Sequence, residues 1–160
     1  MTTLQPSHTN GSHPEFAIQR LYVKDVSFES PLVPEIYDHS LQPMINLNIQ
    51  TTSTKLTDGL FEVVLATTVT ATANEKTVFL AEVKQAGTFT IKNIAEQNMG
   101  AILSVTCPTI LFPYVREAIS ELVARGGFQH FYLAPINFEA LYLDGLKKQQ
   151  QETTKTEETH

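Results

Sequence analysis

The segment that most constrains the fold of this chain is residues 77–91, which read TVFLAEVKQAGTFTI. Successive side chains of a β-strand point to opposite faces of its sheet, so the segment divides into two sets. The mostly apolar set is Phe79, Ala81, Val83, Gln85 and Phe89. The mixed set is Leu80, Glu82, Lys84, Thr88 and Thr90. Neither set is a plain solvent face, so the segment predicts a strand whose sheet makes contacts on both sides.

Three earlier segments also predict strands, at residues 16–28, 44–56 and 60–72. The first two alternate between apolar and polar residues, and the third is rich in Val and Thr, which suit a pleated surface. Turn residues at 58–59 and 74–76 join the later strands closely, which predicts an antiparallel meander. Residues 30–43 contain three prolines and must form a loop.

Strict alternation in the first strand assigns its side chains to two faces. One face would carry Phe16, Ile18, Arg20, Tyr22, Val26 and Phe28. The other would carry Ala17, Leu21, Val23, Asp25 and Ser27, with Glu29 just beyond on the Asp25 side.

Helical periodicity replaces the alternation after residue 91. It predicts a short helix at 94–104, a longer helix from Pro108 to the stop signal Gly126-Gly127, and a last helix at 135–148. The chain is thus predicted to be an α+β protein with one domain at 15–148. Residues 1–14 and 149–160 are polar and are predicted to be a disordered arm and a disordered tail.

Composition and net charge make some classes of binding partner unfavourable. With 42% hydrophobic and 18% charged residues, the 160-residue chain is globular. A net charge of −6 disfavours nonspecific binding of nucleic acid and of anionic membranes. Neither a signal peptide nor an apolar run of about 18 residues is apparent, so we expect a cytoplasmic protein without direct membrane insertion.

Catalytic and metal-binding patterns are weak in this sequence. Among the five histidines, His39 and His130 lie outside the tails but have no partner at ligand spacing. Cys107 precedes a predicted helix, which permits either a reactive thiol or a buried structural cysteine. The strand carboxylates include no evident acid/base pair, and no nucleophile elbow or phosphate loop is present. We therefore expect no metal site, and these residues give no support for a cofactor or for enzymatic activity.

Aromatic residues are more suggestive, because many lie near the predicted loops and helix ends. Together with the apolar side chains of loop 30–43, they fit a groove for apolar peptide segments. Two alternatives stay open: a small-molecule-binding α+β protein or enzyme, and a structural oligomerisation module.

Four longer segments, AIQRLYVKDVSFESP, FLAEVKQAGTFTI, CPTILFPYVREAISELVARGGF and LAPINFEALY, closely resemble the SecB family of bacterial protein-export chaperones. The resemblance runs through residues 15–148. It implies a subunit with a four-stranded antiparallel sheet and helices on one side, assembled as a homotetramer, a dimer of dimers. It also implies an ATP-independent holdase that keeps preproteins unfolded and delivers them to the export motor SecA, without a cofactor.

The same resemblance implies roles for particular residues. The SecA-binding positions are Asp25, Glu29, Leu80 and Glu82. Positions that influence the tetramer are Phe79, Ala81, Val83 and Gln85, and we expect this strand face to need a partner surface beyond the helices of its own subunit. Client-binding positions beside loop 30–43 and the last helix connection are Phe28, Tyr37, Leu41, Phe128, Phe138 and Tyr142.

Overall fold

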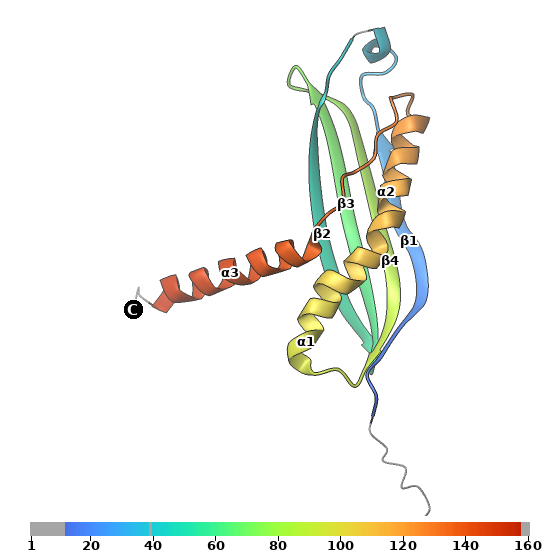
Figure 1. Ribbon diagram of the computed structural model, residues 1–160. Coiled ribbons are helices and arrows are strands. Elements are labelled where there is room, and N and C mark those ends of the chain that lie inside the picture. Colours follow the sequence, from blue (N-terminus) through green and yellow to red (C-terminus); the bar gives the residue numbers. More distant parts are fainter. Residues whose placement is uncertain (1–11, 39, 158–160) are drawn as a thin grey trace, which may run out of the picture.

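A computed structural model describes residues 12–38 and 40–157 of the chain (Figure 1). The strands are β1 (Glu15–Glu29), β2 (Met44–Thr57), β3 (Leu60–Ala73) and β4 (Lys76–Lys92). The helices are α1 (Glu96–Ala101), α2 (Cys107–Arg125) and α3 (Phe138–Glu157), and a 3₁₀ turn, Glu35–Asp38, lies in the β1–β2 loop. The predicted α+β class and four-stranded antiparallel sheet are confirmed.

The sheet has the order β1-β4-β3-β2, so β4 is an inner strand paired on both sides. Tight turns join β2 to β3 and β3 to β4. At the first, Gly59 has a φ of +72°. At the second, Asn74 and Glu75 both have positive φ, as a two-residue hairpin that matches the twist of its strands requires. The long loop after β1 lets that strand pair with β4 at the other side of the meander.

One face of the sheet, here called the helix-side face, packs against α2. The cross-strand pairs Val63–Gly87, Leu65–Gln85, Thr67–Val83 and Val69–Ala81 place these side chains on that face, and all are buried. Helix α2 covers them with Leu111, Val115 and Ile119, each fully buried. Figure 1 shows α2 lying across β3 and β4. The core of the protein is this single interface between helix and sheet.

The burial of this face corrects one expectation from the sequence. Phe79, Ala81, Val83 and Gln85 are only 0–4% exposed in the single chain. Helix α2 and the α2–α3 connection already cover them, so they need no partner surface and cannot touch a second subunit directly. Any influence of these residues on assembly must act through the position of α2.

The prediction of strict alternation in β1 was also wrong, because the pairing of β1 with β4 contains two register shifts. One lies between Ile18 and Arg20 and the other between Val23 and Asp25. Each adds one residue to β1 and reverses which face the following side chains occupy. Arg20 and Tyr22 therefore lie on the outer face, opposite the helices, while Leu21 and Val23 lie on the helix-side face.

Residues Glu96–Arg125 form one continuous helical segment, in which α1 leads into α2 through a π-helical stretch at Ile102–Thr106. The π-helical stretch ends just before Pro108, which has no backbone N–H to donate. By length and mean hydropathy alone, the segment could cross a membrane, contrary to the sequence expectation. In this structure, its most apolar side chains instead pack on the sheet.

Helix α3 continues to Glu157, so the tail predicted to be disordered from residue 149 is helical as far as this residue. Gln, Glu and Lys are good helix formers, which lets the helix extend without an apolar anchor. Figure 1 shows α3 projecting away from the sheet. Most of the predicted N-terminal arm, residues 1–11, lies outside the described residues, as do His39 and residues 158–160.

We predict that Ala81→Tyr destabilises the subunit itself. Ala81 is fully buried between β3 and α2, so a tyrosine ring would overpack the core by about 1–3 kcal/mol. Urea unfolding measures this loss, with exposed Lys84→Tyr on the same strand as the control. An unchanged unfolding midpoint for Ala81→Tyr would contradict the burial of this position.

Candidate functional site

An apolar hollow lies where loop 30–43 meets the end of α2. Its cavity volume is about 540 Å³. Its walls come from the loop, the start of β2, the start of β4 and the segment after α2, and the lining residues include Ile36, Tyr37, Leu41, Ile45, Phe79, Phe128 and Phe131. Apolar walls with an open mouth are what a groove for hydrophobic side chains requires. We call this hollow the first groove.

A cluster of aromatic rings holds the first groove together. Phe79 contacts Phe128 and Phe131 with ring centroids 5.1 and 6.5 Å apart. Tyr37 contacts Phe128 at 5.6 Å, and its hydroxyl donates a hydrogen bond of 2.6 Å to the carbonyl of Gly126. Ring contacts of this geometry and the hydrogen bond fasten the loop to the end of α2.

The local sequence explains why the chain turns at this point. Helix α2 ends at Arg125 with Gly126 as its C-cap, and Gly127 has a φ of +82°, which favours glycine. A Cβ at Gly126 would overlap the ring of Phe28. Phe28 does not line the first groove, but its ring contacts two that do, Phe79 at 5.8 Å and Phe128 at 6.4 Å.

A second hollow, here called the second groove, lies between the base of α3 and β2. It is lined by Ile49, Thr51, Ser104, Phe138, Leu141, Tyr142, Gly145, Leu146 and Gln149. Phe138 is buried and meets Phe112 edge to face at 5.9 Å, so it anchors α3. Leu141 and Leu146 remain 53% and 38% exposed.

Strand β2 connects the two grooves. Ile45 lines the first groove and Ile49 the second, and Leu47 lies between them on the same face. Ile45 and Leu47 are 43% and 39% exposed, unlike the matching residues of β3. Strand β2 is also an edge of the sheet, so one side of its backbone has no strand partner within the described residues. An extended peptide along this edge would meet apolar side chains and backbone hydrogen-bonding groups together.

The structure brings the four predicted SecA-binding residues together on the outer face of the sheet. Glu29 lies opposite Leu80, Ser27 opposite Glu82, and Asp25 opposite Lys84 in the β1–β4 pairing. The Glu82 carboxylate accepts hydrogen bonds from Ser27 at 3.3 Å and Thr68 at 3.4 Å. Asp25 and Glu29 are exposed, and Leu80 is half-buried. The arrangement forms an acidic patch beside an apolar side chain.

A second charged cluster on the outer face joins β1 to β3 across β4. Tyr22 donates a hydrogen bond of 2.5 Å to Glu62, and the Lys24 ammonium lies 3.0 Å from the same carboxylate. Burial, followed by the hydrogen bond to Glu62, raises the pKa of Tyr22 to about 12. The bonds from Tyr22 and then Lys24 lower the pKa of Glu62, which stays ionised. The charge of Lys24 is therefore largely balanced inside this cluster.

The remaining chemical candidates have structural roles. Cys107 is fully buried, and burial raises the pKa of its thiol to about 12, so it is the structural cysteine of the two alternatives. Within residues 12–38 and 40–157, no group of three or more His, Cys, Asp or Glu side chains is placed to hold a metal ion.

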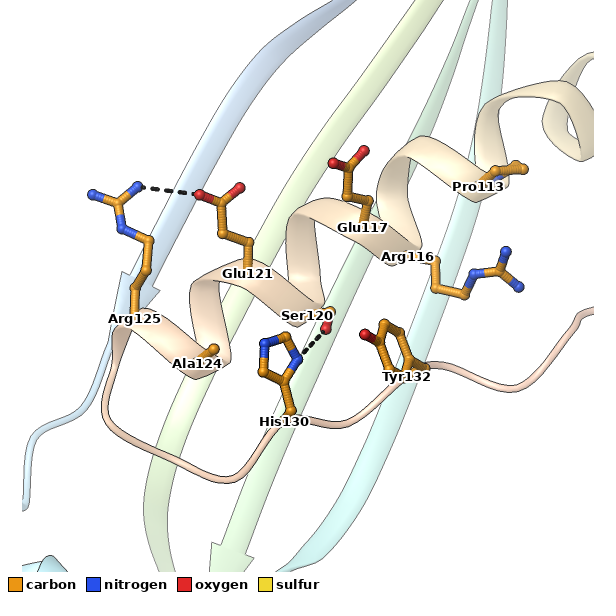
Figure 2. A pocket seen from close by; sticks show the side chains of 9 residues that line it. All are labelled: Pro113, Arg116, Glu117, Ser120, Glu121, Ala124, Arg125, His130 and Tyr132. Atoms are coloured by element: carbon orange, nitrogen blue, oxygen red, sulfur yellow. Dashed lines mark hydrogen bonds and ion pairs between the residues drawn. The ribbon is translucent and has the colours of Figure 1, made fainter.

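Figure 2 shows a hollow on the exposed side of α2, lined in part by Arg116, Glu117 and Tyr132. There, Ser120 Oγ lies 2.9 Å from Nδ1 of His130. Among the described residues, no carboxylate hydrogen-bonds to the other ring nitrogen of His130, as a hydrolytic triad would need. The contact joins the segment after α2 to the helix.

Five of the six predicted client-binding residues line one of the two grooves, whereas Phe28 lies in β1 and lines neither. Tyr37, Leu41 and Phe128 line the first groove, and Phe138 and Tyr142 line the second. Sequence reasoning did not assign the strip Ile45–Leu47–Ile49 to either groove. The alternation of β2 could have shown the strip, because an edge strand with a half-buried apolar face leaves that face accessible.

Comparisons with known proteins agree on the family. The family described as "Preprotein translocase subunit SecB" matches residues 9–151. The protein-export protein SecB of Marinobacter nauticus is 46% identical over 94% of this chain and 93% of its own. That of Xanthomonas euvesicatoria is 50% identical over 88% of this chain and 83% of its own.

Among solved structures, the Mycobacterium tuberculosis SecB-like chaperone, in complex with a ChAD peptide from an antitoxin, has the same fold. Its TM-score is 0.64 at 16% identity, over 76% of this chain and 90% of its own. With this fold, and with both sequence comparisons spanning most of its length, the chain belongs to the SecB family.

Proposed function

We propose that this protein is an ATP-independent holdase of protein export, which binds unfolded preproteins in its two grooves and delivers them to SecA. Family membership supports the chaperone role in export. The observation that carries the client-binding site is the accessible first groove, whose aromatic walls are open to solvent beside the free edge of β2. Binding of this kind is non-catalytic.

The physical basis of the holdase is selective affinity for unfolded chains. An unfolded client exposes apolar side chains and unpaired backbone groups, and both are buried when it lies along β2 and fills the grooves. Because a folded client offers neither, binding favours the unfolded state by mass action, without nucleotide energy. The open grooves and their apolar lining impose little sequence specificity, which suits many clients.

A homotetramer strengthens this binding. Several grooves on one assembly contact one client chain, and effective concentration converts weak single contacts into tight overall binding. Support for assembly comes from Leu143, an exposed apolar residue of α3 outside the second groove, and from the unpaired outer edge of β1 in the described chain.

SecA docking on the acidic patch uses the opposite face of the sheet. Asp25, Glu29 and Glu82 surround Leu80, which fits a basic segment with an apolar anchor. Charge complementarity of this kind sets encounter rate and specificity, and it weakens with salt. Since the grooves lie on the helix side, client and motor can be bound together.

Changing Tyr37 and Leu41 together to Ser should weaken binding of an unfolded client about tenfold or more, because two walls of the first groove lose their apolar surface. Titration of a labelled unfolded protein measures this affinity. Tyr37→Phe keeps the ring but loses the hydrogen bond to Gly126. Its affinity therefore shows how much of any loss comes from the bond that anchors the loop and how much from the apolar surface of the groove. Leu56→Ser, an exposed apolar residue elsewhere on β2, is the control. Equal losses of client and SecA binding would mean that the loop is only structural.

Glu82→Lys should reduce SecA binding sharply while client binding stays intact. The lysine adds repulsion to the lost attraction, and Ser27 and Thr68 would no longer hold a carboxylate. Calorimetry against the C-terminal segment of SecA at two salt concentrations tests this, with Glu75→Lys in the β3–β4 turn as a matched control. Affinity that does not depend on salt, or full affinity of the Glu82 variant, would refute the patch.

Light scattering at low micromolar concentration should give four times the mass of one chain. A tetramer should also persist when an unfolded client is added, since the grooves are proposed to remain accessible in it. A single-chain mass under these conditions would contradict the proposed assembly.

A further inference from the structure

The outer face of the sheet carries cations as well as the acidic patch. We call Arg20, Lys24 and Lys84 the basic zone, and Asp25, Glu29 and Glu82 the acidic zone. The β1–β4 pairing sets their order along the sheet: Glu29 lies opposite Leu80, Asp25 opposite Lys84, and Arg20 opposite Thr88. From Leu80 to Thr88 the strand rises about 26 Å at roughly 3.3 Å per residue. Acidic side chains therefore predominate at the Leu80 end of the strip and Arg20 lies at the Thr88 end, with Asp25 and Lys84 opposite one another between them.

Two register shifts in β1 produce this order. The first, after Ile18, puts Arg20 and Tyr22 on the outer face instead of the helix side. The second, after Val23, keeps Asp25, Ser27 and Glu29 on the outer face as well. Bulges of this kind commonly re-aim side chains at functional surfaces.

Only part of the basic zone is balanced within the subunit. Lys24 is paired with Glu62. Arg20 and Lys84 are exposed, and neither forms an ion pair with any side chain in the part of the chain that the structure describes. Two free cations next to the acidic zone offer matching partners for carboxylates on a bound molecule.

We propose that the segment docked on the outer face is bipolar: its cationic residues contact the acidic zone, and acidic residues about four to eight positions away contact Arg20 and Lys84. This inference rests on the proposed docking function and specifies the chemistry of its partner. Arg20 and Lys84 are then specificity-determining residues, because they accept a segment of mixed charge and repel a purely basic one.

The surface favours a short peptide segment over larger partners. A stable contact with a second copy needs about 1,200–2,000 Å² with an apolar, charge-depleted centre. Here the centre of the face holds the Tyr22–Glu62–Lys24 cluster. Nucleic acid needs a larger basic surface than two free cations on a chain of net charge −6.

Labelled peptides test the proposal directly on the full-length protein. One probe of about nine residues, long enough to span the strip, has a lysine block, central leucines and a glutamate block, and is made in both block orders. The comparison probes carry glutamines in place of the glutamates. Because the protein is negatively charged, net charge alone favours the glutamine probes. Fluorescence anisotropy at low salt gives both affinities.

We expect one order of the bipolar probe to bind about three to ten times more tightly than its glutamine counterpart. Arg20→Glu combined with Lys84→Glu should reverse this preference, and Arg20→Gln with Lys84→Gln should abolish it. Lys148→Glu on α3 makes a matched charge change far from the face and should preserve it. Equal affinity of the two probes for the wild type, or a preference that persists in the Arg20/Lys84 variants, would overturn the proposal.

Further measurements separate this proposal from the docking function on which it rests. If Glu82→Lys leaves binding of the glutamine probe unchanged, the acidic zone itself has failed. If Glu82→Lys weakens binding of the glutamine probe, but the bipolar probe binds the wild type no more tightly than the glutamine probe does, only the bipolar inference has failed. Saturable binding of a single-stranded oligonucleotide, or self-association by light scattering, that depends on Arg20 and Lys84 would assign the basic zone to those partners instead and refute the proposal.

Discussion

Burial of one face of β4 beneath α2 is the contact on which the rest of the molecule depends. The helix-side residues Ala81 and Val83 are fully buried against α2, and their neighbours on β3 complete the core. Because one helix supplies this cover, the opposite face of the same strand remains free for Leu80, Glu82 and Lys84. A strand with two different faces thus divides the subunit into a packed side and an open, charged side.

The position of α2 also determines which part of the sheet stays open. Helix α2 covers β3 and β4 but leaves β2, so the apolar strip at Ile45, Leu47 and Ile49 stays accessible. The segment after Gly127 and the base of α3 close the two ends of this strip and create the grooves. Shifts of α2 would therefore change the shape of both grooves.

Much of the fold follows from the sequence because β2, β3 and most of β4 keep their alternation. The helix stop at Gly126-Gly127 and the turn at Asp58-Gly59 are equally local signals, fixed by backbone conformations that glycine adopts readily. The faces of β1 could not be predicted, since a bulge depends on pairing with β4 rather than on the local pattern. The full length of α3 was not predicted either. Its polar residues after 148 have helix propensity, but they lack the apolar periodicity by which a helix is recognised in a sequence. The sequence predicted one groove with aromatic residues. That the structure has two separate grooves depends on how the helices pack on the sheet.

The two bulges in β1 are both needed to bring Arg20, Asp25 and Glu29 onto the same face of the sheet. Without either, Asp25 and Glu29 would still share a face, but Arg20 and Tyr22 would point toward the helix side, where charge is costly. With only the first, Asp25 and Glu29 would turn toward α2, and the acidic patch would lose its contact with Leu80 and Glu82. Both shifts together put Arg20, Asp25 and Glu29 on the same face as Leu80 and Glu82, while Val26 and Phe28 remain on the helix-side face. The irregular strand therefore keeps charged side chains out of the apolar core and gathers them on the outer face of the sheet.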